Sequence, residues 1–191
     1  MNRYNPNIHH RRSIRLKGYD YSQKGLYFVT ICTQKRECLF GKIIDNVMIL
    51  NIAGEMVNKI WLEIPQIFPK IKSHEYIIMP NHFHAIIEIV GADSISAQHA
   101  DSISAQHANS ISAQHADHMV SLPRIIQTFK RYTTVEYIKL VKQNLLPPFE
   151  KRIWQRNYYE HIIRDEKSFK IISEYIINNP LKWNKDKYYE R

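Results

Sequence analysis

Residues 75–90 read EYIIMPNHFHAIIEIV, and the fold expected for the whole chain starts from this stretch. Two runs rich in apolar and β-branched residues flank a Pro-Asn pair, a combination that predicts two adjacent strands joined by a tight turn. Successive side chains of a strand point to opposite faces. His82 and His84 are therefore expected on one face of a sheet, and Phe83 on the other.

Strand character recurs at three other places, which are 26–33, 149–163 and, as a second strand or a hairpin arm, 42–50. Apolar residues at helical spacing predict three helices. Their expected limits are an N-cap at Asn51 with an interruption at Pro65, a start after Ser121, and a start at Asp165 with an end at Pro180. This order of elements predicts an antiparallel sheet with helices packed on it, an α+β fold.

The length and charge of the chain limit what it can be. Its 191 residues suit a single domain over 1–191, and 44% hydrophobic residues suffice for a core. Lys and Arg outnumber Asp and Glu by 27 to 18, and the resulting net charge of +9 attracts polyanions. Many small proteins are basic for solubility alone, so the charge by itself does not identify a nucleic-acid partner.

The cysteines and the apolar runs bear on location. Cys32 and Cys38 form neither a C-x-x-C pair nor a disulfide framework, which fits a reducing cytoplasm. The N-terminus lacks the apolar core of a signal peptide, and no later run approaches the ~20 apolar residues of a membrane span. We therefore expect a soluble, cytoplasmic protein that does not enter a membrane.

Residues 93–116 are three copies of an eight-residue unit, DSISAQHA twice and then NSISAQHA. The unit is polar with small side chains, and its period is too short for a solenoid repeat, so a disordered insertion is expected. Its histidines, His99, His107 and His115, match no compact set of metal ligands at this spacing. A spacer is favoured over a metal site.

Two pairs of residues have spacings that could serve chemistry. His82 and His84, on one strand face, can bind one divalent ion, although two hydrogen-bonded histidines would give the same pattern. Tyr175 and Asn179 are four residues apart and share one helix face. A tyrosine beside a metal-bound phosphate can act as a nucleophile once its proton is removed, but Tyr175 could equally be a core aromatic.

Several motifs together resemble one family. MPNHFHAIIEI, WQRNYYEHIIRDEKSF and EYIINNPLKW are similar to the single-tyrosine transposases of small insertion sequences, and most of all to their domesticated relatives associated with repeated extragenic palindromes (REP). HRRSIRLKGYDYSQKGLYFVTICT near the N-terminus also resembles that subgroup. The resemblance covers nearly the whole chain except the repeat insertion. It implies a ferredoxin-like antiparallel sheet with packed helices, as in endonucleases with a His-hydrophobic-His (HUH) motif.

The resemblance also implies roles for individual residues. His82 and His84 would bind Mg²⁺ or Mn²⁺, with Asn179 as a third, oxygen ligand. Tyr175 would attack the scissile phosphate and leave a 5′-phosphotyrosine link and a free 3′-OH. The substrate would be single-stranded or hairpin DNA, and the protein a monomer or a homodimer. The candidate DNA contacts are Arg11, Arg12, Arg15, Lys17, Trp154, Gln155, Arg156 and Tyr158.

Several alternatives stay open at this point. A non-catalytic nucleic-acid-binding module can have the same sheet, although the chain lacks the aromatic signature of RNA-recognition folds. A transposase relative could also have kept DNA binding and lost cleavage. Tyr158 and Tyr159 compete with Tyr175 as the nucleophile. Pro180 places Asn179 at a helix boundary, which weakens its assignment as a ligand.

Overall fold

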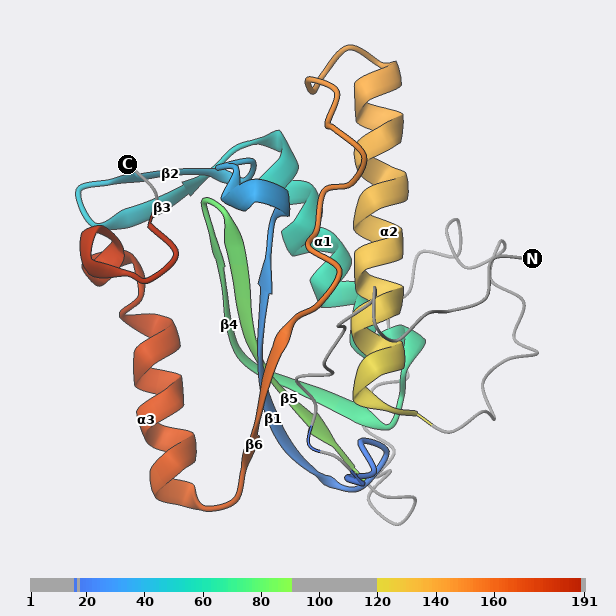
Figure 1. The fold of residues 1–191 in the computed structure, drawn as a ribbon, viewed down its shortest axis with the longest axis vertical. Helices are drawn as coiled ribbons and strands as arrows, with labels where there is room; N and C mark the ends of the chain where they lie inside the picture. Colours follow the sequence, from blue (N-terminus) through green and yellow to red (C-terminus); the bar gives the residue numbers. More distant parts are fainter. Residues whose placement is uncertain (1–15, 17, 91–119, 190–191) are drawn as a thin grey trace, which may run out of the picture.

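The computed structural model describes residues 16, 18–90 and 120–189, and an antiparallel sheet of four strands forms its centre. The strand order is β4 (Ile71–Met79), β5 (His82–Ile89), β1 (Gly25–Cys32) and β6 (Tyr159–Ile163). Helices α1 (Ile52–Ile67) and α2 (Leu122–Lys142) lie on one side of this sheet and α3 (Glu166–Ile177) on the other (Figure 1). The expected α+β fold with a ferredoxin-like antiparallel sheet is confirmed.

Each face of the sheet has its own core, because strand residues alternate between the faces. On one side Phe83 packs against Trp61 of α1 and Phe129 of α2, with ring centroids 4.7 and 5.0 Å apart. On the other side Phe28 and Ile86 pack with Ile176 of α3. His82 and His84 share the face of Ile86, so the expected alternation places both histidines in the layer beneath α3.

Two strand expectations need refinement. Segment 42–50 forms a separate hairpin of β2 (Gly41–Ile44) and β3 (Val47–Leu50), because Asp45 and Asn46 adopt φ of 49° and 63° and allow a two-residue turn. Segment 149–163 is a strand only at β6. In its earlier part only Trp154 pairs with a strand-like neighbour, through an isolated bridge to Thr33, and the Trp154 side chain is buried and hydrogen bonded to Thr133 of α2.

The helices begin where the capping residues predict, but they do not end at the prolines. Asn51 caps α1 through a 3.0 Å bond from the Gly54 amide, which confirms the expected N-cap. Pro65 does not interrupt α1, which runs on to Ile67, because a proline in the last turn removes only one helical hydrogen bond. Helix α3 ends at Ile177, and Pro180 instead begins a short 3₁₀ segment, η5 (Pro180–Lys185).

Some of the sequence predictions lie outside the described residues. These are the repeat insertion at 93–116 and the basic residues Arg11, Arg12, Arg15 and Lys17. Across the described ranges, none of the helices combines the length and the apolar character that a membrane crossing requires.

Candidate metal and nucleophile site

The two histidines lie at the start of β5 and are almost fully buried, with exposed fractions of 0% for His82 and 1% for His84. In each ring Nδ1 is hydrogen bonded to a neighbouring side chain. Nδ1 of His82 lies 2.8 Å from Oδ1 of Asn81, and Nδ1 of His84 lies 2.9 Å from Oγ1 of Thr30. The ring centroids are 4.5 Å apart, so the two remaining Nε2 atoms belong to one small site.

Tyr175 brings its hydroxyl to this site from α3. The hydroxyl oxygen is 3.3 Å from Nε2 of His84, and the ring meets Phe28 edge-on at 6.1 Å between centroids. Burial, with the charge of Asp186, raises the pKa of Tyr175 to about 12, although a hydrogen bond from Asn179 acts in the opposite direction. The hydroxyl therefore stays protonated at neutral pH until a partner takes its proton.

Two oxygen-bearing residues complete the cluster. Asn179 follows α3 with helical angles of −60° and −42°, so it remains about one turn from Tyr175 although the helix has ended. Its Nδ2 donates to Oδ2 of Asp186 at 3.3 Å. The possible ligand atoms of His82, His84 and Asp186 all lie within 4.8 Å of one another.

Asp186 was not among the residues expected from the sequence. It lies just after η5, and the adjacent Tyr188 amide donates to its Oδ1 at 2.7 Å. The segment that contains it is joined to the sheet by a long-range contact, because Nδ2 of Asn81 donates to the Tyr188 carbonyl at 2.8 Å. The only signal in the sequence is one acidic residue within the lysine-rich stretch LKWNKDK.

The donor atoms of this cluster fit a divalent metal ion. Nε2 of His82 and Oδ1 of Asn179 are buried and have no hydrogen-bond partner among the described residues. Burial lowers the pKa of both histidines, with help from the positive charge of Lys187, and for His84 to about 3. Both imidazoles are therefore neutral at physiological pH and keep a lone pair for a ligand bond. Two nitrogens with carboxylate and amide oxygens form a mixed donor set that suits an open metal site.

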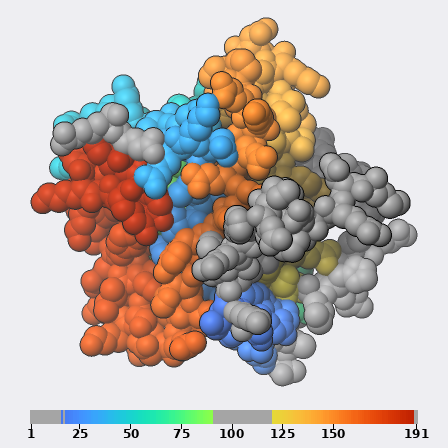
Figure 2. Space-filling model, viewed as in Figure 1, coloured from blue at the N-terminus to red at the C-terminus, as the bar shows by residue number. Residues whose placement is uncertain are grey.

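Positive charge lies beside the cluster. The ammonium of Lys187 is 4.8 Å from the ring centroid of Tyr188 and 5.4 Å from that of Tyr159. The guanidinium of Arg36 lies 5.6 Å from the Tyr188 ring. Figure 2 shows the C-terminal segment lying against the residues that follow β1, where Arg36 also donates to the Lys187 carbonyl at 3.3 Å. Such cations favour an anionic ligand near the cluster.

The expected DNA contacts in 154–158 occupy different environments. Trp154 and Tyr158 are 4% and 8% exposed, so neither ring has an open face on which a base could stack. The indole of Trp154 instead donates to Thr133 at 2.8 Å. Gln155 is half-buried and donates to the Thr33 carbonyl at 3.1 Å, whereas Arg156 is exposed. Among these four residues, Arg156 is the one whose side chain is exposed.

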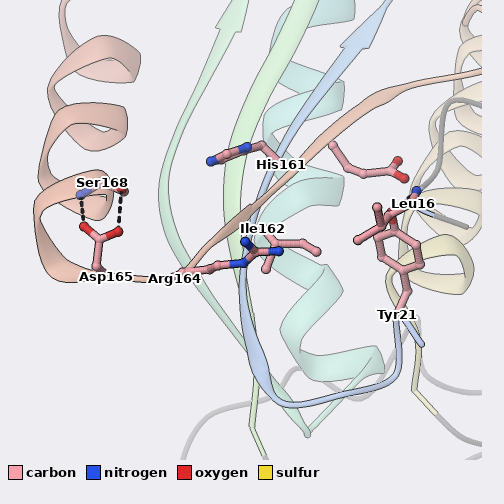
Figure 3. A pocket seen from close by; sticks show the side chains of 8 residues that line it. Leu16, Tyr21, His161, Ile162, Arg164, Asp165 and Ser168 are labelled. Atoms are coloured by element: carbon pink, nitrogen blue, oxygen red, sulfur yellow. Dashed lines mark hydrogen bonds between the residues drawn. The ribbon is translucent and has the colours of Figure 1, made fainter. Parts of the chain in front are cut away.

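A surface pocket of about 380 Å³ lies elsewhere, along β6 and the start of α3 (Figure 3). Arg164 and His161 contribute to its wall, and Asp165 binds the backbone amide and the hydroxyl of Ser168 at 2.8 and 2.9 Å. Its lining includes neither the histidines of β5 nor Tyr175. The pocket is thus distinct from the candidate metal site.

A comparison with solved structures identifies the fold. The structure is similar to that of a REP-associated tyrosine transposase bound to a REP hairpin, with a TM-score of 0.51 and 17% sequence identity over 90% of this chain and 74% of that one. The protein therefore has the fold of the HUH-type transposases. No protein-family model matches the chain.

The family is defined by a closer relative. A protein of Haemophilus influenzae is 44% identical to this chain over 187 residues, which cover 98% of this chain and 97% of the relative. This chain belongs to the same family as that protein. The relative is described only as an uncharacterized protein, so it assigns no activity.

Proposed function

We propose that the protein is a metal-dependent endonuclease and strand transferase for single-stranded DNA that acts near hairpin-forming repeats. The observation that carries this proposal is the 3.3 Å contact between the Tyr175 hydroxyl and Nε2 of His84, within the cluster of His82, Asn179 and Asp186. A nucleophile and a set of metal ligands thus share one site. The similarity in fold to a transposase bound to a REP hairpin supports hairpin DNA as the substrate.

In the proposed reaction Tyr175 supplies the nucleophilic oxygen. Its oxygen forms a bond to the scissile phosphorus as the bond from phosphorus to the 3′-oxygen breaks, which gives a 5′-phosphotyrosine and a 3′-hydroxyl. The tyrosine proton must leave and the departing oxygen must gain one. Because Nε2 of His84 would be occupied as a metal ligand, the proton would pass to solvent and the departing 3′-oxygen would take one from solvent. The 3.3 Å contact with Nε2 of His84 places the Tyr175 hydroxyl beside the ligands. Lys187 lies where it can face the phosphate charge.

His82 and His84 would hold the metal ion, with an oxygen ligand from Asn179, from Asp186 or from both. The carboxylate and amide oxygens suit Mg²⁺ and Mn²⁺, and the open positions of such a site would take oxygens of the phosphate. When bound, such an ion neutralises phosphate charge and stabilises the leaving oxygen. The hydrogen bond from Asn179 to Asp186 aligns these two oxygen donors with each other.

The decisive experiment is to find the tyrosine that becomes attached to DNA. A 5′-extended single-stranded hairpin is incubated with the protein and Mn²⁺, the product is trapped in denaturant, and the modified peptide is mapped by mass spectrometry. We expect the adduct on Tyr175, and its loss in Tyr175→Phe with hairpin binding retained. Tyr132→Phe, which removes a hydroxyl from α2, is the matched control and should keep the adduct.

Other outcomes separate the remaining alternatives. An adduct on Tyr158 or Tyr159 would show that this other tyrosine is the nucleophile, while the proposed type of reaction would stand. Cleavage that persists in EDTA, or in His82→Ala and His84→Ala, would contradict the metal mechanism. Hairpin binding with no adduct under any condition would favour the non-catalytic binding module, or a relative that has lost cleavage.

A further inference from the structure

We propose that Asn81 is a positioning residue that selects the tautomer of His82 and fastens the segment of Asp186 beside it. The inference rests on the proposed function in one respect, because it assumes that Nε2 of His82 is a metal ligand. Asn81 lies in the turn between β4 and β5 and is 0% exposed. Its role follows from the three partners of its side-chain amide.

Two backbone carbonyls fix which way the amide points. The carbonyl oxygens of Arg36 and Tyr188 lie 3.1 and 2.8 Å from Nδ2 of Asn81. A carbonyl oxygen can only accept a hydrogen bond, so the amide atom that faces both must be the nitrogen. The Oδ1 atom of Asn81 is therefore the one that faces His82.

The amide orientation in turn fixes the tautomer of His82. Oδ1 of Asn81 is 2.8 Å from Nδ1 of His82, and because this oxygen only accepts, Nδ1 must carry the hydrogen. A neutral imidazole has one ring N–H, so Nε2 is left with a lone pair. This Nε2 is buried and has no hydrogen-bond partner in the described part of the chain. Asn81 thus presents to the cluster the nitrogen that a metal ion requires.

The same side chain ties the C-terminal segment to the sheet. The Tyr188 carbonyl accepts from Asn81, while the Tyr188 amide donates to Oδ1 of Asp186 at 2.7 Å. Asn81 is itself held in place, because its carbonyl accepts from the Thr33 amide and hydroxyl, both at 2.9 Å. The tautomer of His82 and the position of Asp186 therefore depend on one rigid amide.

The first test observes the tautomer directly and needs no metal. In protein labelled with ¹⁵N at histidine and kept in EDTA at neutral pH, two-bond ¹H–¹⁵N spectra show which ring nitrogen carries the proton. We expect His82 to carry it on Nδ1 in the parent protein and in Asn81→Asp, whose side chain also has an oxygen that accepts. In Asn81→Ala we expect the Nε2–H form to appear. A parent protein with its proton on Nε2 of His82 would overturn the proposal, whether or not either variant folds.

The second test measures Mn²⁺ affinity and the exchange of the Tyr188 amide with deuterium. Asn81→Ala should weaken Mn²⁺ binding by about 10- to 100-fold, in the range for losing a group that orients a ligand, and should speed exchange at Tyr188. Asn58→Ala on α1, where Asn58 accepts only from the Tyr76 hydroxyl among the described contacts, is the matched control and should change neither quantity. Unchanged Mn²⁺ affinity and exchange in Asn81→Ala would refute the positioning role. A parent that binds no Mn²⁺ but shows the Nδ1–H tautomer would count against the proposed function alone.

Discussion

At the scale of single residues, burial keeps both histidines neutral and able to bind a ligand, and it also makes the folded protein less stable in acid. His82 and His84 are nearly fully buried, and burial keeps their pKa low because a charged imidazole would lose its hydration. In the unfolded chain the same groups titrate near their ordinary value of about 6.5. Folding therefore holds both rings neutral over a range of pH in which unfolding would let them take up protons.

This difference predicts how stability changes with pH. The pKa of His84 is about 3 in the folded protein, so between pH 6.5 and 3 the unfolded state binds more protons and stability falls as pH falls. The slope for each such histidine approaches about 1.4 kcal/mol per pH unit. Urea unfolding in EDTA at pH 7.5 and pH 5 should show this loss of unfolding free energy, and His84→Gln should show a smaller loss. Equal losses in the two proteins would contradict a lowered pKa of His84 in the folded state.

Asp186 gives a second prediction at this scale. Asp186→Asn keeps the shape of the side chain but removes its charge, so we expect Mn²⁺ affinity to fall by about tenfold or more. The pKa of Tyr175 should fall too, because the charge of Asp186 helps to raise it. Calorimetric Mn²⁺ titration and ultraviolet titration of tyrosine measure the two effects. Asp165→Asn, which removes a charge at the N-cap of α3, is the matched control and should leave Mn²⁺ affinity as it is. A Mn²⁺ affinity in Asp186→Asn equal to that of the parent would show that Asp186 is not a ligand.

At the scale of elements, two short connecting segments hold candidate functional residues in place. After α3 ends, Asn179 keeps a helical conformation, so Tyr175 and Asn179 still face the same cluster. The loop before β6 is held in a different way. The ammonium of Lys130 on α2 donates to the carbonyls of residues 155, 156 and 157 at 2.9, 3.4 and 3.2 Å. One charged side chain thus organises the loop that presents Arg156.

We therefore expect Lys130→Met to loosen this loop. The three carbonyls would lose their charged donor, and local stability should fall by roughly 1.5–3 kcal/mol, the range for a hydrogen bond that involves a charged group. Deuterium exchange should speed up within 154–158, and hairpin DNA should bind more weakly. Lys139→Met on the same helix removes an exposed ion pair with Glu136 and serves as the control. Unchanged exchange in 154–158 would show that the loop holds its shape without Lys130.

At the scale of the whole molecule, the described segments on either side of the repeat are fastened to the rest of the fold. The Val90 amide donates to the Lys70 carbonyl at 2.9 Å, and the Leu122 amide to the Tyr21 carbonyl at 3.0 Å. The start of α2 contributes Leu122, Ile125 and Ile126 to the larger core. The described residues that precede and follow the repeat are therefore held by contacts that do not involve 93–116.

This arrangement leads to a prediction about the repeat. Joining Gly91 to Asp117 through a short linker should leave the melting temperature and Mn²⁺-dependent cleavage close to those of the parent, because the repeat sequence has no apolar face to bury. Calorimetry and a hairpin cleavage assay check the two properties. A large drop in the melting temperature would mean that the repeat takes part in the single domain proposed for 1–191, and lost cleavage at normal stability would give it a part in the reaction.

The sequence by itself determined the features that depend on near neighbours. Strand alternation placed His82 and His84 on one face, Asn51 and Asp165 capped their helices, and the spaced motifs pointed to the fold. Only the tertiary structure decided that Asp186 joins the histidines, that Trp154 is buried, and that Thr133 and Tyr137 of α2 face the core while Val135 and Ile138 are exposed. The physical reason is the range of the forces involved. Caps and alternation act over a few residues, whereas the contact between Asn81 and Tyr188 that closes the site joins residues 107 apart in the sequence and exists only when the whole chain has folded.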